Sequence, residues 1–197
     1  SNSDVAMVVA GQIHIVAAGT SVITASQGGN TNYNAAPDVQ QTLTVSKSTQ
    51  TITFPALDAV TYGDPDFDAG ATASSGLTVT YTSGNTDVAT VEGGLISING
   101  AGTAVITASQ SGDENYDAAA TVQQTLTVNK APQTITFGSL PAYIYGDPDF
   151  SLTATASSGL EVTFTGDNDA VASLEGNTVH ITGAGSAVIT ARQPGNE

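Results

Sequence analysis

Cysteine and tryptophan are both absent from this 197-residue sequence, and basic residues are scarce. Without cysteine the chain can form no disulfide, no thiolate metal site and no cysteine nucleophile. Only Lys47, Lys130 and Arg192 stand against 18 acidic residues, which leaves a net charge of −15. Such a chain offers no cationic surface to a phosphate backbone or to anionic lipid. Nucleic acids and membrane surfaces are therefore excluded as direct partners.

Long apolar runs are missing as well. No segment approaches the roughly 18 unbroken apolar residues of a membrane span, so we expect no direct membrane insertion, and we expect no signal peptide in this stretch. Charged residues make up only 11% of the chain. Thr, Ser, Asn, Gln and Gly are abundant instead, and they suit strands and turns better than helices. This composition predicts an all-β protein.

An internal 83-residue repeat organises the chain. Gln-Thr-Ile-Thr-Phe stands at 50–54 and 133–137, Tyr-Gly-Asp-Pro-Asp-Phe at 62–67 and 145–150, and Gln-Gln-Thr-Leu-Thr-Val at 40–45 and 123–128. The pattern Ala-Gly-x-x-Val-Ile-Thr-Ala starts at residues 18, 101 and 184. The period predicts a complete repeat at 47–129, the rear part of another at 1–46, and the front part of a third at 130–197.

The two end pieces overlap in the repeat instead of completing one another. Residues 1–31 and 167–197 cover the same part of the repeat, so the two pieces together are longer than one period. We therefore interpret the chain as an excerpt from a longer array, and strand exchange between molecules is the alternative. The junctions around residues 45–50 and 128–133 have no flexible Gly/Ser tract, so we expect an extended, semi-rigid rod.

Alternating apolar and polar residues predict eight strands in the complete repeat, bounded by turn residues. Leu77, Val79 and Tyr81 fall on one face, with threonines on the other. Short strands at this spacing are typical of a sandwich or barrel. The predicted strands lie near 50–54, 58–61, 67–73, 77–82, 87–91, 95–98, 103–109 and 121–128.

These motifs, with residues 73–81, 87–91 and 100–110, resemble the bacterial immunoglobulin-like repeats of large secreted or cell-surface adhesins, and are similar to the MBG-type and group-2-like repeats. The resemblance covers the whole chain. It implies tandem immunoglobulin-like β-sandwich domains, export, and an extracellular position at the bacterial cell surface. It also implies structural stalk or spacer repeats, whose partners are the neighbouring repeats of the same chain, projecting a binding region or forming a surface filament.

Two other functions stay open. The chain is alternatively a binding module that holds glycans or surfaces through its loops and outer sheet faces. A further option is lateral self-association into a filament through edge strands. We do not expect an enzyme, because no set of nucleophile, base and acid recurs with the repeat.

Five aspartates are candidate calcium ligands: Asp64, Asp66, Asp68, Asp147 and Asp149. Carboxylates on alternate residues of an extended segment can share one calcium ion, which needs six to eight oxygen ligands. Serine stands at 151, where the complete repeat has Asp68, so the second copy has one carboxylate fewer. The alternative is an acidic turn in which the aspartates bond the nearby backbone. No other cofactor is expected.

Three further features favour structural interpretations. The acidic loop at 113–117 has amides in its counterpart at 30–34, which favours a solvated loop anchored by Tyr33 and Tyr116. His14 and His180 lie at equivalent positions, and alternation places them on the outer face. An isopeptide crosslink from Lys47 or Lys130 would need a buried lysine beside a carboxyl group, whereas junction lysines are expected to be exposed.

Overall fold

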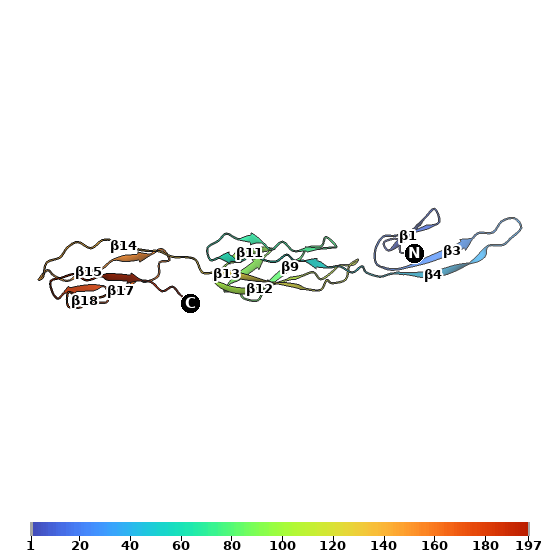
Figure 1. The fold of residues 1–197 in the computed structure, drawn as a ribbon. Helices are drawn as coiled ribbons and strands as arrows, with labels where there is room; N and C mark the ends of the chain where they lie inside the picture. The colour runs from blue at the N-terminus through green and yellow to red at the C-terminus, as the bar shows by residue number, and fades with distance from the viewer. Residues whose placement is uncertain (1, 197) are drawn as a thin grey trace. The chain divides into compact units, whose positions relative to one another are not determined.

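The computed structural model describes residues 2–196, which form strands joined by turns and loops (Figure 1). The chain divides into two compact units, Ser1–Lys130 and Ala131–Glu197. Across residues 2–196, no helix has the length and apolar character needed to cross a membrane. The strands of the first unit are β1 (Ala6–Val9), β2 (Gln12–Ile15), β3 (Gly19–Gln27), β4 (Ala36–Val45), β5 (Ile52–Thr53), β6 (Val60–Thr61), β7 (Phe67–Asp68), β8 (Thr72–Ala73), β9 (Thr80–Ser83), β10 (Ala89–Glu92), β11 (Leu95–Ile98), β12 (Gly102–Ser109) and β13 (Val122–Asn129).

The complete repeat is a sandwich built around one apolar core. A four-stranded sheet has the order β6-β13-β12-β9, a three-stranded sheet has the order β10-β11-β7, and β5 pairs with β8. Ile96, Ile106 and Leu126 are fully buried between these sheets. Leu77, Val79 and Tyr81 are half-buried between exposed threonines, as the alternation predicted. The all-β, immunoglobulin-like sandwich is confirmed.

The strand predicted at 67–73 is divided in the structure. β7 pairs with β11, whereas β8 pairs with β5, so this segment leaves one sheet and joins another. The change occurs at Gly70, whose φ of 74° lies in the left-handed region that residues other than glycine rarely adopt. The Asp68 carboxylate accepts the Gly70 N–H at 2.8 Å and holds the bend. Periodicity alone did not reveal this crossing.

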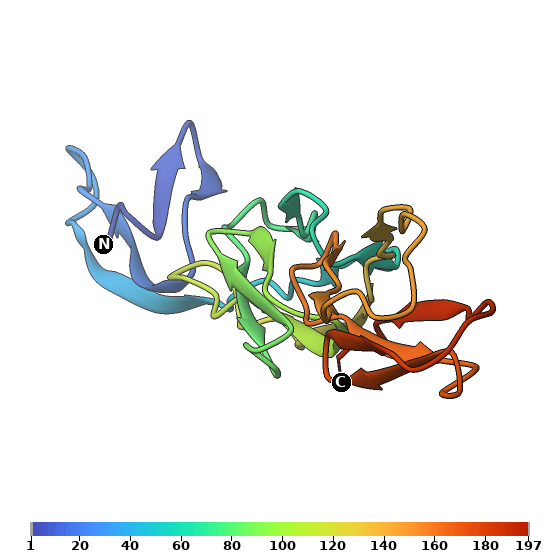
Figure 2. The ribbon, with the colours of Figure 1, turned by 90° about the vertical axis from the view of Figure 1, so that its left-hand side faces the viewer.

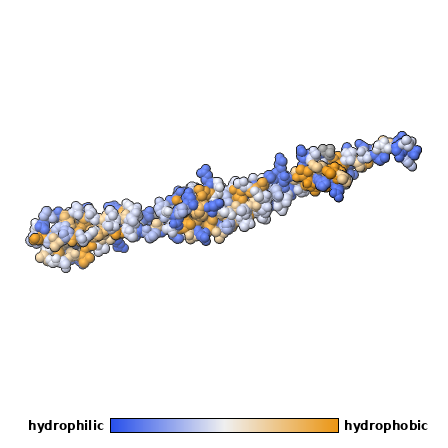
Figure 3. Space-filling model, turned by 90° about the horizontal axis from the view of Figure 1, so that it is seen from above, coloured by the Kyte–Doolittle hydropathy of each residue, from blue (hydrophilic) through white to orange (hydrophobic). Residues whose placement is uncertain are grey.

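The first partial repeat contains the β1–β2 hairpin and a long β3–β4 ladder, which lie beside each other in blue in Figures 1 and 2. Residues 2–46 contain no counterpart of β5 to β9, so one face of these strands is uncovered. Ile13 is 50% exposed here, whereas the equivalent Ile96 is 0% exposed. Hydrophobic residues accordingly reach the surface as orange patches in Figure 3.

The second unit repeats the front of the sandwich. Its strands are β14 (Ile135–Phe137), β15 (Phe150–Ser151), β16 (Ala154–Ala156), β17 (Thr163–Gly166), β18 (Ala172–Glu175), β19 (Thr178–Ile181) and β20 (Ile189–Arg192). They pair as β14-β16, β15-β19-β18 and β17-β20. Among residues 131–196 no strand corresponds to β13, and β20 has four residues where the equivalent β12 has eight.

One glycine has the same structural role in all three repeats. Gly19, Gly102 and Gly185 have φ values of 136°, 142° and 147°. A Cβ atom at each would lie 2.8 Å from a methyl group of a valine in the same repeat. The three valines are, in the same order, Val5, Val88 and Val171. The glycine therefore lets the start of a core strand pass close to that valine. The threefold recurrence shows that the 83-residue period in the sequence is a period in backbone geometry.

Candidate functional site

The three aspartates of the complete repeat point to different partners. Asp64 accepts the backbone N–H of the residue three positions earlier at 2.7 Å. Asp66 accepts the Ser97 hydroxyl at 2.8 Å, and Asp68 bonds the backbone two residues later at the bend between β7 and β8. All three residues are exposed. Each carboxylate thus stabilises a local turn or a contact to β11.

The same pattern holds in the second unit. Asp147 accepts the Ile144 N–H at 2.8 Å, just as Asp64 does in its own turn. Asp149 bonds His180 instead of a serine. No group of three or more acidic, histidine or cysteine side chains within residues 2–196 is arranged to hold a metal ion. Calcium binding by these aspartates stays a prediction, while the turn interpretation now has defined hydrogen bonds.

The pairing of His180 with Asp149 was not expected from the sequence. His180 Nδ1 lies 2.6 Å from Asp149 Oδ2, and its Nε2 lies 3.9 Å from Glu175 Oε2. The imidazole is 38% exposed, in keeping with its predicted place on the outer face. The signal was present in the repeat, because Ser97 and Asp66 are the equivalent residues and make the equivalent bond. The position therefore accepts either a hydroxyl or an imidazole donor.

The loop at 113–117 keeps its shape with or without a carboxylate. Asp113 Oδ1 accepts the backbone N–H groups two and three residues later, both at 2.8 Å. Asn30 Oδ1 makes the same two bonds at 2.8 and 3.0 Å. Tyr116 is half-buried, but Tyr33 is 76% exposed, so its expected anchoring role is wrong. The reason is that residues 2–46 contain no counterpart of Ser48, which forms a β-bridge with Tyr116.

This loop also holds the junction between the first two repeats. The exposed Lys47 donates from Nζ to the Asp113 carbonyl at 2.6 Å. Ser48 N donates to the Asn115 carbonyl at 2.8 Å, and Asn115 Oδ1 accepts the Ala18 N–H at 2.8 Å. Asn115 therefore contacts both the linker and the preceding repeat. An isopeptide crosslink requires a lysine that is buried beside a carboxyl group. Lys47 is exposed and does not meet this requirement.

A buried amide network lies at the start of the complete repeat. Gln50 and Gln110 are 7% and 9% exposed. Gln50 Nε2 donates to Gln110 Oε1 and to the Asp117 carbonyl, both at 2.7 Å. Gln50 Oε1 accepts the Ser75 hydroxyl, and Gln110 Oε1 also accepts the Gly112 N–H. This pair of side chains thus connects the segment that leads into β5, the turn before β9 and the loop after β12.

The network recurs in the second unit with the same atoms. Gln133 Nε2 donates to Gln193 Oε1 at 2.6 Å, and the Ser158 hydroxyl donates to Gln133 Oε1. In the sequence alone, the glutamine that opens each Gln-Thr-Ile-Thr-Phe motif is recognisable only as a marker of the repeat. Its role was detectable in principle, because Gln110 and Gln193 share the same 83-residue spacing. The motif is therefore structural, and it joins segments 60 residues apart.

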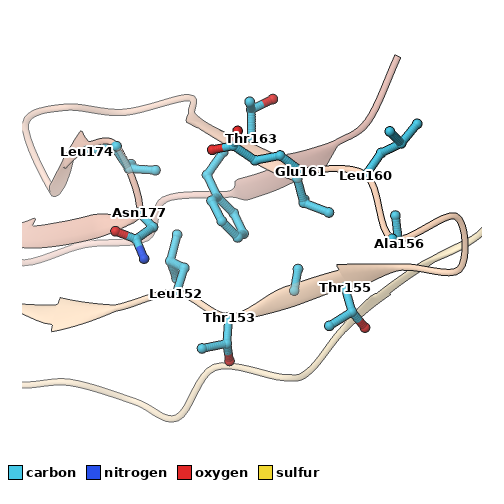
Figure 4. A pocket seen from close by; sticks show the side chains of 14 residues that line it. Leu152, Thr153, Thr155, Ala156, Leu160, Glu161, Thr163, Leu174 and Asn177 are labelled. Carbon is cyan, nitrogen blue, oxygen red and sulfur yellow. The ribbon is translucent and has the colours of Figure 1, made fainter. Parts of the chain in front are cut away.

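A wide hollow of about 1030 Å³ opens in the second unit between β16 and residues 160–164 (Figure 4). Leu152 points into the space between the strands, while Thr153 points away. In the complete repeat, the Tyr81 hydroxyl spans the equivalent position. It accepts the Ala71 N–H at 3.0 Å and donates to the Ala71 carbonyl at 3.2 Å. Phe164 replaces this tyrosine and lacks the hydroxyl, so it cannot make the equivalent bonds to Ala154.

Comparison with known proteins gives one family match and one structural match of low similarity. Residues 68–112 match the family model described as the intimin immunoglobulin-like domain, and they lie within the complete repeat. A search of curated proteins finds no match. Among solved structures, the chain is similar to surface layer protein SbsC, domains 1–6, with 16% identity and a TM-score of 0.33. That alignment covers 96% of this chain and 27% of the other, so this chain spans about a quarter of its length.

Proposed function

We propose that these repeats are structural spacers of a bacterial cell-surface or secreted adhesin, without enzymatic activity. The match of residues 68–112 to an intimin immunoglobulin-like domain supports this placement. The equivalent residues, 1–29 and 151–195, share its sequence pattern, so the same kind of module accounts for most of the chain. MBG-type repeats are the finer family that we propose, on the motifs described above.

The observation that carries the proposal is the bonded junction at residues 45–50. The linker is not a free tether, because Lys47 and Ser48, at the start of the complete repeat, donate to carbonyls of that repeat's own loop at 113–117. Asn115 of that loop accepts from Ala18 of the preceding repeat. A spacer needs such joints, since a flexible linker would let the repeats fold back on one another.

Small-angle scattering tests the spacer function. The intact chain is compared with a version that carries one additional 83-residue repeat. A spacer gains roughly 40 Å in maximum dimension per repeat, the span of strands of about eight residues with their turns. An unchanged maximum dimension would mean that repeats pack side by side, and the proposal would be abandoned. Repeating the measurement with calcium and then with chelator tests whether the aspartate turns bind the ion.

Binding of glycans or surfaces is the second candidate function. Tyr62 and Tyr145 are 52% and 70% exposed and occupy the same position of successive repeats. An exposed aromatic ring can stack on a sugar face. Glycan-array binding that is lost in the double variant Tyr62→Ala/Tyr145→Ala would favour this function. Absence of binding by the unaltered chain would count against it.

A further inference from the structure

The two sheets of the complete repeat differ in charge. No residue of β6, β9, β12 or β13, the strands of the four-stranded sheet, is charged. The three-stranded sheet carries Asp68 on β7 and Glu92 on β10. The chain as a whole has a net charge of −15, so two copies repel one another wherever their acidic surfaces approach. The four-stranded sheet is therefore the face through which two copies can approach with the least repulsion.

The outer face of this sheet is an array of threonines around one valine. Thr103 lies opposite Thr127 and Val105 lies opposite Thr125, and all four residues are exposed. Val105 is 40% exposed although it lies in the middle of β12. On its other side Gly84, whose N–H donates to the Val105 carbonyl at 2.9 Å, has no side chain to cover it. The centre of the face is thus uncharged and accessible.

The same array recurs with the 83-residue period. In the first partial repeat, Thr20 on β3 lies opposite Thr44 on β4, and Val22 lies opposite Thr42. Val22 is 38% exposed, and Val188, at the same position of the second unit, is 63% exposed. The face is therefore a property of the repeat, and each copy of the chain presents it at least twice.

The chemistry of this face fits a second copy of itself. A threonine hydroxyl both donates and accepts a hydrogen bond, so threonines can pair with threonines. Valine methyl groups can pack on the methyl groups of the opposing face. A contact in which both partners use the same patch needs such self-complementarity. A sugar ring would instead need an aromatic platform, and β12 and β13 contain no aromatic residue.

We propose that the outer face of β12 and β13, with its equivalent on β3 and β4, is a self-association surface that packs against the same face of a second copy of this chain. Two such sheets lie about 10 Å apart, with the pair Val105 and Thr125 near a two-fold axis. The contact goes beyond the proposed spacer function, because it joins neighbouring molecules. It also leaves the edge strands unused, unlike association by strand pairing.

The size of the face determines how tightly two copies bind. Four strands about 4.8 Å apart and about eight residues long span at most roughly 400 Å². A stable complex buries roughly 800 Å² on each partner, about twice this area. One pair of faces therefore gives a weak contact, and we expect a dissociation constant on the order of 0.1–1 mM for the chain. Longer arrays present the face more often and should associate more tightly.

An NMR dilution series of the intact chain tests the proposal. Between about 1 mM and about 0.02 mM, concentration-dependent amide shifts are expected at residues 103–107 and 123–127, with matching changes at 20–24 and 40–44. Added salt should strengthen the association, because it screens the repulsion between acidic chains. Shifts that stay constant up to about 1 mM, shift changes confined to other residues, or weakening by salt would each overturn the proposal.

Two oppositely charged double variants distinguish face-to-face packing from general stickiness. In Val22→Lys/Val105→Lys and in Val22→Asp/Val105→Asp, like charges oppose each other across the contact, so each variant alone should associate at least about tenfold more weakly. An equimolar mixture should associate again, because lysine then faces aspartate. Restored association also shows that both variants fold. A mixture that associates no better than its components would refute the proposal.

Gln12→Lys/Leu95→Lys is the matched control. Gln12 on β2 and Leu95 on β11 are exposed, occupy equivalent positions of their repeats, and lie outside the proposed face. The added charge equals that of Val22→Lys/Val105→Lys. Association should stay within about twofold of that of the unaltered chain, since exposed positions outside a contact contribute little. An equal loss in this control would show that the lysines act without regard to the face, and would overturn the proposal.

Discussion

Loss of one member of the buried pair Gln50 and Gln110 should lower the free energy of unfolding by more than the net value of the hydrogen bonds that are lost. In Gln110→Leu, the side-chain volume is similar, but one of the two Gln50 Nε2 hydrogens loses its acceptor at 2.7 Å and the Gly112 N–H loses its acceptor. An unsatisfied buried donor costs about 1–3 kcal/mol. Gly112 is only half-buried and adds less. We therefore expect the free energy of unfolding of the complete repeat to fall by about 2–4 kcal/mol.

The double variant Gln50→Leu/Gln110→Leu tests the reasoning more sharply. With both amides gone, neither leaves the other unpaired, so the loss should be smaller than the sum of the two single losses by about 1–3 kcal/mol. Hydrogen exchange of the β12 and β13 amides, followed by mass spectrometry on the intact chain, reports the opening of this repeat. The untouched pair Gln133 and Gln193 serves as an internal reference.

Gln27→Leu is the matched control, because Gln27 occupies the equivalent position in the first repeat and is exposed. Its side-chain oxygen accepts the Gly29 N–H at 2.7 Å. A change below about 0.5 kcal/mol is expected there. The reasoning is refuted if Gln110→Leu has no larger effect than this control, or if the losses in the double variant simply add.

Three other perturbations follow from the repeat geometry. Gly102→Ala should destabilise the complete repeat by about 2–4 kcal/mol through backbone strain and the 2.8 Å approach to Val88, whereas Gly138→Ala, in open space, should change the thermal midpoint little. Tyr81→Phe should lower the free energy of unfolding of the complete repeat by about 1–2 kcal/mol, and Phe164→Tyr should slow hydrogen exchange at residues 154–156. No change in either variant would disprove that the hydroxyl bridges the two segments. Asp64→Ala should lower the free energy of unfolding by about 0.5–2 kcal/mol, measured by urea unfolding in the presence of chelator. A loss that appears only when calcium is added would instead indicate an ion site.

The 83-residue period made much of the fold predictable. Most strands of the complete repeat recur at equivalent residues of the other repeats, and the alternation in 77–81 correctly assigned the buried face. The division of 67–73 into β7 and β8 was not predictable in the same way. Alternation identifies faces, but it does not say which sheet a strand joins, and the bend depends on the backbone of Gly70.

The polar contacts were harder to predict because they join distant residues. The two glutamines are 60 residues apart, and Asp149 meets His180 across two strands of one sheet. The local sequence pattern around one residue of each pair does not identify its distant partner. Comparison between repeats is more informative, because a pair of polar residues that recurs together, such as Asp66 with Ser97 and Asp149 with His180, marks a contact. Calcium binding stays a prediction, since the hydrogen bonds of the aspartates explain their positions without deciding affinity.

The parallel pairing of β6 with β13 has a mechanical consequence. β6 lies near the start of the complete repeat and β13 ends it, and the two strands run in the same direction with Val60 opposite Val128. Tension applied through the linkers at 47 and 130 would therefore slide one strand along the other. In that geometry the hydrogen bonds between them share the force at once instead of opening one after another. A chain of such repeats would therefore resist stretching along its length.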